Sequence, residues 1–343
     1  MKYRKVNMRV AVLGAGINGL GCAVKIKEKY PNFDVVIISN KFTPDTTGDG
    51  SGGLWKPYCS GKTPQTLITK WGMESYRLYH KLWLEGGYDV TLVPLYDLYR
   101  ENKPLPERPW SNLVFGFKNL DEKHLEYLNR LHHSDFVSGI TFTSFVVRPS
   151  TMLAHLTQRF KTVGGRMLTR SIKSLDDEEL MTYDVIVNCL GLGARDVVPD
   201  DKMFPVRGQL MRVHAPWLTA TIYDVQNDIY MICTTDICVM GGTQQVNDYN
   251  RQINVEDRDK IFNGCTSVVP AIKNAKLISE WVGLRPGREE IRLESEIING
   301  KFYIHNYGHG GSGFTLFWGC ASNVLEIFEE HVDREHNKQK SKL

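Results

Sequence analysis

Three glycines near the N-terminus are spaced as in a phosphate-binding turn. Gly14, Gly16 and Gly19 lie between an apolar run that ends at Leu13 and a segment with helical periodicity. In such a turn the first glycine allows the tight bend, the second lets the backbone approach a pyrophosphate, and the third lets the helix pack on the strand. The pattern alone is weak, but a second apolar run at residues 33–39 completes a strand–turn–helix–strand unit. We therefore predict a dinucleotide site, with a purely structural turn as the alternative.

The acidic residue that usually holds a ribose after the second strand is missing. Here the strand is followed by Asn40 and Lys41. Asn40 can hydrogen-bond a ribose as a neutral partner, or it can be only a turn residue, and the sequence leaves both open. We expect both residues at the cofactor site, without a defined ribose contact.

A second glycine-rich stretch lies at residues 306–319, with the sequence NYGHGGSGFTLFWG. It combines five glycines with several aromatic residues, and its only acidic or basic side chain is His309. A linker would be more polar, and a core helix would contain fewer glycines. The stretch is either a backbone surface for a flat ligand or a glycine-rich strand-to-helix turn within a core.

Bulk composition limits the possible functions. The 343 residues carry a net charge of +3, which is too weakly basic to indicate a nucleic-acid partner. The seven cysteines contain no Cys-x-x-Cys pair, so we expect reduced thiols and no metal site. Residues 308–325 are nearly uncharged, but their five glycines and polar residues argue against a membrane span. The basic first residues lack the long apolar run of a signal peptide.

Hydrophobic periodicity predicts an α/β protein with two domains. Strands are expected at residues 9–13, 33–39, 165–175, 183–191, 204–215, 228–245, 276–289 and 301–308, helices at 17–30, 148–165 and 314–332, and a lid-like segment at 217–228. Strand–helix units thus occur at the start, middle and end of the chain, separated by longer strands. This order predicts a discontinuous, Rossmann-like nucleotide domain with an inserted β-rich domain. The expected boundaries are 1–58, 145–200 and 285–335 for the first domain, 59–144 and 201–284 for the second, and 336–343 for a flexible tail.

Motifs along the chain resemble those of the FAD-dependent D-amino-acid oxidases and D-aspartate oxidases. The similarity runs from Arg9 to about Glu329 and is specific in order and spacing. The motifs are FTPDTTGDGSGGLWKPY (42–58), NCLGLGAR (188–195), FPVRGQ (204–209), APW (215–217), GGTQQ (241–245), VGLRP (282–286) and YGHGGSGFTLFWG (307–319). Within the family, FTPDTT, KMFPVRGQ and GLGAR look closer to the D-aspartate oxidase branch.

The resemblance implies FAD as the cofactor and assigns residues to it. The glycine-rich loop would lie under the isoalloxazine ring, where a Cβ would be in the way, and the N-terminus of the following helix would stabilise the reduced flavin. For the two threonines in this set, a capped turn is the alternative. The implied cofactor residues are Gly14, Ala15, Gly16, Ile17, Asn18, Gly19, Asn40, Lys41, Thr46, Thr47, Gly53, Leu54, Leu190, Gly310, Gly313, Phe314 and Thr315.

The resemblance also assigns the substrate site. Arg285 would grip the α-carboxylate with its guanidinium, Tyr230 would support the same carboxylate, and the Gly311 carbonyl would accept from the substrate amine. From the sequence alone, Arg285 is equally compatible with a structural ion pair, and Tyr230 with a core aromatic. Residues implied near the substrate side chain are Tyr58, Tyr223, Gln244 and Ser312.

The implied reaction needs no acid or base from the protein. A neutral amine would pass hydride from Cα to flavin N5, the imine would hydrolyse to a 2-oxo acid and ammonia, and dioxygen would become hydrogen peroxide. The protein supplies orientation and electrostatics. His305 and His309 are therefore expected to be hydrogen-bonded structural residues.

The substrate side chain is where the chain departs from its nearest branch. D-aspartate oxidases hold the second carboxylate with arginines, whereas the matching positions here are Tyr223 and Gln244. Because an unpaired carboxylate in a dry pocket is costly, we expect neutral or polar D-amino acids to be preferred. D-aspartate and D-glutamate remain the alternative, since Arg251 or Lys56 can supply a charge from another direction.

Ser341-Lys342-Leu343 matches a peroxisomal address read by an import receptor. This motif suits a peroxide-producing oxidase, so we expect a location in the peroxisomal matrix. Two other functions stay open from the sequence: an NAD-linked dehydrogenase that uses the same glycine turn, and a catalytically silent relative that binds ligand.

Overall fold

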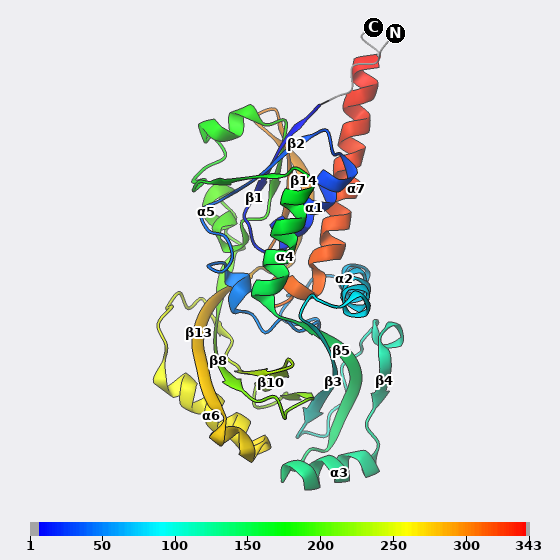
Figure 1. Cartoon of the computed structure of the whole chain (residues 1–343), viewed down its shortest axis with the longest axis vertical. Helices are drawn as coiled ribbons and strands as arrows, with labels where there is room; N and C mark the ends of the chain where they lie inside the picture. The colour runs from blue at the N-terminus through cyan, green and yellow to red at the C-terminus, as the bar shows by residue number, and fades with distance from the viewer. Residues whose placement is uncertain (1–6, 341–343) are drawn as a thin grey trace.

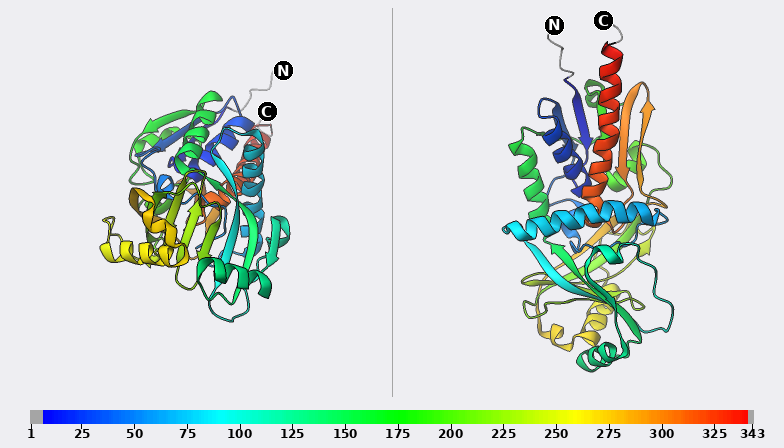
Figure 2. Two further views of the ribbon diagram at one scale, coloured as in Figure 1. Left: turned by 60° about the horizontal axis from the view of Figure 1, so that its bottom comes forward. Right: turned by 90° about the vertical axis from the view of Figure 1, so that its right-hand side faces the viewer.

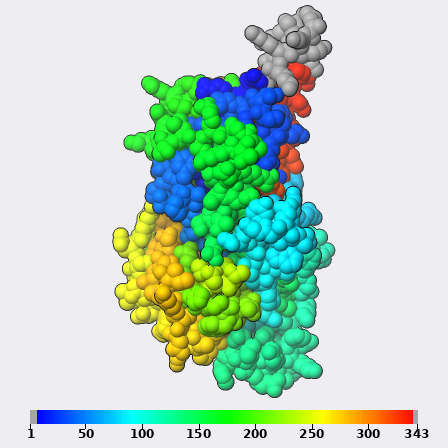
Figure 3. Space-filling model, viewed as in Figure 1, coloured from blue at the N-terminus to red at the C-terminus, as the bar shows by residue number. Residues whose placement is uncertain are grey.

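The computed structural model describes residues 7–340 and contains two β-sheets, one in each half of an elongated molecule (Figure 1). It confirms the predicted α/β class. The segments around residues 10–40 and 150–200 fill much of the upper half of the space-filling view, and residues 204–287 occupy much of the lower half (Figure 3).

The first sheet has six strands within the described chain. They lie in the order β14 (Arg292–Ile298), β15 (Lys301–Tyr307), β7 (Val185–Asn188), β1 (Arg9–Leu13), β2 (Asp34–Ser39) and β6 (Arg166–Thr169). All neighbours are parallel except β14, which is an antiparallel edge strand. Continuous apolar runs form β1 and β2 because a parallel sheet is buried on both faces.

Helices cover one face of this sheet. Val10 and Val12 on β1 belong to a core cluster shared with α1 (Ile17–Lys29), α4 (Pro149–Thr162) and α7 (Gly313–Lys340), whereas Ala11 and Leu13 point to a separate cluster on the other face. This alternation follows the two-residue period of a strand. Because α1 follows β1 and α7 follows β15 in the chain, the N-termini of both helices lie at the carboxyl ends of these parallel strands. This is the end of the sheet where α/β proteins bind ligands.

The second sheet has nine strands among the residues described and is mostly antiparallel. Its order is β12 (Gln245–Val246), β8 (Phe204–His214), β11 (Ile237–Gly241), β10 (Ile229–Cys233), β9 (Thr221–Asp224), β3 (Val90–Tyr99), β5 (Ser138–Val147) and β4 (Phe115–Asn119), with β13 (Lys276–Gly287) paired to β8. The helices α3 (Glu122–His132) and α6 (Val255–Val268) lie at the lower end of the molecule, and α2 (Gln65–Glu85) crosses between the two halves (Figure 2). A short helix, α5 (Ala194–Val197), follows β7.

Several predicted elements are confirmed, and some are wrong. The first strand, the glycine turn, α1 and α4 lie where the sequence places them, and β13 runs through Arg285 as expected. The predicted lid at 217–228 instead contains β9, a central strand between β10 and β3. The predicted single strand at 228–245 is the β10–β11 hairpin followed by β12.

The predicted flexible tail is also corrected in part, because α7 continues to Lys340; Ser341-Lys342-Leu343 lies outside the described residues. The domain boundaries stay a prediction, since sheet membership alone does not define a folding unit. In the part of the chain that the structure describes, no helix is both long and apolar enough to cross a membrane, and no group of three or more metal-ligating side chains is found.

Candidate cofactor and substrate site

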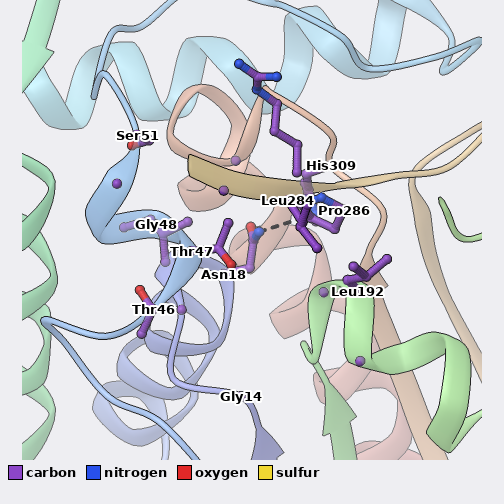
Figure 4. A pocket seen from close by; sticks show the side chains of 18 of the residues that line it. Gly14, Asn18, Thr46, Thr47, Gly48, Ser51, Leu192, Leu284, Pro286 and His309 are labelled. Atoms are coloured by element: carbon purple, nitrogen blue, oxygen red, sulfur yellow. Dashed lines mark hydrogen bonds between the residues drawn. The ribbon is translucent and has the colours of Figure 1, made fainter. Parts of the chain in front are cut away.

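A cavity of about 790 Å³ lies between the two sheets and is lined by residues from both (Figure 4). At one end are the β1–α1 turn and the ends of β2 and β7. At the other end are side chains of β9, β10 and β13. A cavity of this length and volume, with glycine backbone at one end and polar side chains at the other, suits a dinucleotide beside a small substrate.

The β1–α1 turn has the geometry of a phosphate-binding site. Gly14 has φ +96°, and a Cβ on Gly19 would lie 1.9 Å from the Gly14 carbonyl oxygen, so only glycine lets the helix approach the strand this closely. A Cβ on Gly16 would meet nothing within 4 Å, which leaves open space beside the turn. The N-terminus of α1 has no side-chain cap and no acidic residue in its first turn. Its free N–H groups therefore favour an anion.

The glycine-rich segment before α7 forms a second helix N-terminus at the same cavity. Gly310 has φ +54°, and a Cβ there would lie 1.9 Å from the Cys59 carbonyl oxygen. Glycine at this position is required by the neighbouring loop as well as by any ligand. The first turn of α7 contains no acidic residue. Its dipole therefore adds a second positive partial charge to the cavity wall.

The loop at Thr46 and Thr47 fits both interpretations left open by the sequence. Thr46 caps the short 3-10 helix η1 (Thr47–Gly50): its backbone N and its Oγ1 both donate to Asp49 Oδ2, at 2.9 and 2.7 Å. Both threonines also line the cavity. The cap fixes the loop, which leaves the Thr47 side chain as the more available of the two for a ligand.

Unpartnered polar atoms mark the cavity as a polar ligand site. Asn18 Oδ1, Ser51 Oγ, Tyr58 Oη and His309 Nε2 are buried and have no hydrogen-bond partner among the described residues, and all four side chains line the cavity. Asn18 Nδ2 lies 3.2 Å from His309 Nδ1 (Figure 4). Burial lowers the pKa of His309 to about 3, so this imidazole is neutral at physiological pH. Buried polar atoms without partners are costly, and a bound ligand would satisfy them.

Arg285 provides a guanidinium at the substrate end. Its Nη1 donates to the Thr243 carbonyl at 2.9 Å, and no described carboxylate lies within salt-bridge distance of it. The structural ion pair that the sequence left open is thus not found among residues 7–338. A Cβ on Gly208 would lie 2.4 Å from the guanidinium, so this glycine on β8 makes room for it. The sequence did not single out Gly208.

Two stacked tyrosines lie beside Arg285. The rings of Tyr223 and Tyr230 are 5.3 Å apart between centroids, and both line the cavity. Burial raises the pKa of Tyr230, which keeps its phenol protonated and able to donate a hydrogen bond. The positive charge of Arg285 partly opposes this rise in the pKa of Tyr230, as expected for a guanidinium close to the phenol.

Lys56 is the second cation of this region, and it is already paired. Its Nζ lies 2.5 Å from Asp97 Oδ1 and 3.5 Å from the ring centroid of Tyr223. Burial lowers the pKa of Lys56, and Asp97 opposes that shift. Asp97 also lies 3.4 Å from Arg108. Asp97 is an acidic residue in a largely apolar strand, which is only a weak sequence signal for such a role.

Most residues implied at the site do line this cavity. They are Gly14, Ala15, Gly16, Ile17, Asn18, Asn40, Lys41, Thr46, Thr47, Tyr58, Gly53, Leu54, Leu190, Tyr223, Tyr230, Arg285, Gly310, Gly311, Gly313 and Phe314. Gly19, Gln244, Ser312 and Thr315 are not among the residues that line it. For all of these residues, inside and outside the wall, the assignment to FAD or to substrate stays a prediction.

Two of these outer residues hold the loop that carries Lys56 and Tyr58. Ser312 Oγ accepts from the backbone N of Tyr58 at 2.8 Å and donates to its carbonyl at 2.7 Å. Thr315 Oγ1 does the same for Lys56, at 3.1 and 2.9 Å. Both hydroxyls therefore hold the backbone of Lys56 and Tyr58, whose side chains line the substrate end of the cavity.

Comparison with known proteins identifies the family. A family model described as FAD dependent oxidoreductase, and named DAO, matches residues 9–327. The chain belongs to this family. A D-amino acid oxidase of Dugesia ryukyuensis is 33% identical over 335 residues, which cover 94% of this chain and 98% of the relative. A D-aspartate oxidase of Homo sapiens is 35% identical over 332 residues, which cover 94% and 95%.

Solved structures agree on the fold. Glycine oxidase from Bacillus cereus superposes with a TM-score of 0.76 at 16% identity, covering 95% of this chain and 96% of that one. Glycine oxidase from Geobacillus kaustophilus gives a TM-score of 0.77 at 16% identity, covering 94% and 95%. The resemblance inferred from the motifs is confirmed, and FAD rather than NAD is the cofactor of this oxidoreductase.

The residues present fit FAD. The uncapped N-terminus of α1, the N-terminus of α7 without acidic residues, the space beside Gly16 and the unpartnered Asn18, Ser51 and His309 atoms offer a charged, polar cofactor the partners it needs. The β1–α1 turn would hold the pyrophosphate, and the Gly310–Phe314 segment would lie by the flavin.

Proposed function

We propose that the protein oxidises D-amino acids with dioxygen, giving 2-oxo acids, ammonia and hydrogen peroxide. The observation that carries the proposal is Arg285, a guanidinium at the far end of the cofactor cavity that has no carboxylate partner within the described part of the chain. Relatives named D-amino acid oxidase and D-aspartate oxidase support it. An amino acid brings the α-carboxylate that such a guanidinium lacks.

The protein's own residues would orient the substrate. Arg285 and the Tyr230 phenol would bind the α-carboxylate, and the Gly311 carbonyl would accept a hydrogen bond from the amine. Phe314 and Leu54 would contribute an apolar wall that excludes water from the reacting carbon. FAD, when bound, supplies the two-electron oxidation chemistry. Neutral His309 would act as a hydrogen-bonding residue and not as a base.

The side-chain preference that we propose is for neutral or polar D-amino acids. Tyr223 and Gln244 are uncharged, and Lys56, the cation that lies over the Tyr223 ring, is bound to Asp97 at 2.5 Å. A substrate carboxylate would have to compete with Asp97 for it. Oxidation of D-aspartate and D-glutamate remains the second candidate, because exposed Arg251 also lines the cavity.

A peroxide assay across a panel of D-amino acids tests the proposal, with the L-forms as controls. The purified protein should be yellow and should release peroxide with D-forms only. If the flavin-loaded protein gives no peroxide with any D-amino acid, a catalytically silent, ligand-binding function would be favoured instead. A D-aspartate rate above those for D-alanine and D-methionine would reverse the side-chain preference.

We further propose that the protein acts in the peroxisomal matrix and is imported through Ser341-Lys342-Leu343. The helix α7, which precedes this motif, extends beyond the rest of the molecule (Figure 2). A variant without Leu343 should keep its activity and move to the cytosol. Continued sorting of that variant to peroxisomes would show that the motif is not the address.

A further inference from the structure

Asp228 is a carboxylate close to the substrate end that neither the cofactor nor the proposed reaction uses. It lies in the turn between β9 and β10, half-buried, with φ +53°. Its Oδ1 accepts from Gln244 Nε2 at 2.9 Å, and its backbone carbonyl accepts from the Gly242 N–H at 3.0 Å. No cation lies within salt-bridge distance of it among the described residues.

One short segment joins Asp228 to the carboxylate-binding guanidinium. Residues 241–244 bond to Asp228 through Gly242 and Gln244, while the Thr243 carbonyl accepts from Arg285 Nη1 at 2.9 Å. The cation and the carboxylate are therefore held at a fixed separation on either side of this segment.

The segment Tyr58–Cys59 also contacts both Gln244 and Arg285. Gln244 Oε1 accepts from Cys59 Sγ at 2.8 Å, and Tyr58, the preceding residue, faces Arg285 with its ring centroid 5.9 Å from the guanidinium carbon. Gln244 is exposed, so Asp228 lies just outside the cavity wall towards solvent. Burial is the main cause of the raised pKa of Tyr58, and the Asp228 carboxylate adds to it, which indicates that its field reaches the cavity.

The cations around the substrate end leave the Asp228 carboxylate without a counter-charge among the described residues. The Lys56 ammonium binds Asp97. Arg285 is reserved for the α-carboxylate in the proposed reaction. Arg251 is exposed on the wall, in a segment whose neighbouring Gln252 carbonyl binds Arg207. An acidic substrate side chain directed towards Gln244 would meet the Asp228 carboxylate, whereas a cationic one would be attracted.

We propose that Asp228 extends the proposed preference to D-amino acids with long cationic side chains, such as D-arginine, and favours them over neutral side chains of the same shape and over acidic ones. With the α-carboxylate on Arg285, the guanidinium of D-arginine would extend past Tyr58 to Asp228 and Gln244. This inference rests on the proposed function and names its substrate class. Asp228 would act on specificity by charge, without contact with the reacting carbon.

D-arginine and D-citrulline form the sharpest pair of substrates for a test, because they have nearly the same shape and differ in charge. The ratio of their kcat/KM values is measured for the flavin-loaded wild type, for Asp228→Asn and for Glu126→Gln, a matched charge removal on exposed α3. Asparagine tolerates positive φ and can still accept from Gln244, so the turn should be kept. The neutral substrate cancels any general loss of activity.

The wild-type ratio should exceed 1, and it should fall at least about five-fold in Asp228→Asn and stay unchanged in Glu126→Gln, as expected for one partly exposed charge pair. Added salt should lower the ratio in the wild type and in Glu126→Gln, but not in Asp228→Asn. A ratio that Asp228→Asn leaves unchanged, with D-citrulline still oxidised, would overturn this inference and leave the proposed function intact. Failure to oxidise any D-amino acid would instead overturn the proposed function and this inference together.

Discussion

The guanidinium of Arg285 faces the ring of Tyr58, with 5.9 Å between the guanidinium carbon and the ring centroid. It is anchored through one N–H to the Thr243 carbonyl, and its remaining donors have no carboxylate among the described residues. Arg285 is half-buried, and a partly desolvated cation without a counter-charge is costly unless a ligand supplies one. This relationship is the reason to place the α-carboxylate of the substrate here.

Arg285→Leu should nearly abolish turnover while the protein stays folded and yellow. Loss of the charged partner of a bound carboxylate costs on the order of 3–5 kcal/mol, or roughly 10²–10⁴-fold in kcat/KM. Steady-state peroxide release with D-alanine measures it, and Arg130→Leu on exposed α3 is the control. A leucine variant with normal KM would remove Arg285 from the substrate site.

The pair Tyr223→Arg and Gln244→Arg should shift preference towards D-aspartate. Each new guanidinium offers the side-chain carboxylate a partner, and the arginine at 244 would also neutralise Asp228. We expect the ratio of kcat/KM for D-aspartate to that for D-alanine to rise by roughly ten-fold or more. The double change to methionine, which adds no charge, should leave the ratio near its wild-type value. An equal rise in both double variants would show that charge is not the cause.

His309 should make the folded state acid-sensitive. Its pKa is lowered to about 3 in the fold, against about 6.5 when unfolded, so between these values the unfolded state binds more protons. Stability contributed by the neutral imidazole is therefore present above pH 6.5 and is lost as pH falls towards 3. Between pH 7 and pH 5 this amounts to about 2 kcal/mol. The unfolding free energy of His309→Gln should fall by about that much less over the same range, and parallel curves would contradict it.

Gly310→Ala should weaken FAD retention and stability. At φ +54° an added Cβ would lie 1.9 Å from the Cys59 carbonyl oxygen, so the loop beneath the cofactor must move. Gly300→Ala is the matched control, because φ is +77° there but nothing lies within 4 Å of the added Cβ. Backbone strain alone, as in the Gly300 variant, costs about 1 kcal/mol. The melting temperature of the Gly310 variant should therefore fall further than that of the Gly300 variant. Equal losses in both would assign the effect to backbone strain.

Local features of the fold could be predicted from the sequence. The strand Arg9–Leu13, the glycine turn and α4 depend on short-range periodicity, turn chemistry and a proline start, all of which are visible within one segment. The family motifs extended this to the cofactor, and most of the residues that they implied line one cavity.

Features set by distant contacts could not be predicted in the same way. The segment at 217–228 has turn residues on both sides of β9, and only pairing with β3 and β10 makes it a central strand. The bond from Lys56 to Asp97 joins residues 41 positions apart, and the bond from Gln244 to Asp228 depends on the hairpin that brings them together. Hydrophobic periodicity along the sequence does not indicate which distant polar residues form such pairs.

The proposed reaction requires that D-amino acids reduce the bound flavin. This is measured by mixing the yellow protein with D-alanine, D-methionine or D-arginine without oxygen and following flavin absorbance near its visible maximum. We expect the D-forms to bleach the absorbance and the L-forms to leave it unchanged, and we expect no bleaching of Arg285→Leu by D-alanine on the same timescale. A visible spectrum that no D-amino acid changes in the flavin-loaded wild type would contradict the proposed reaction.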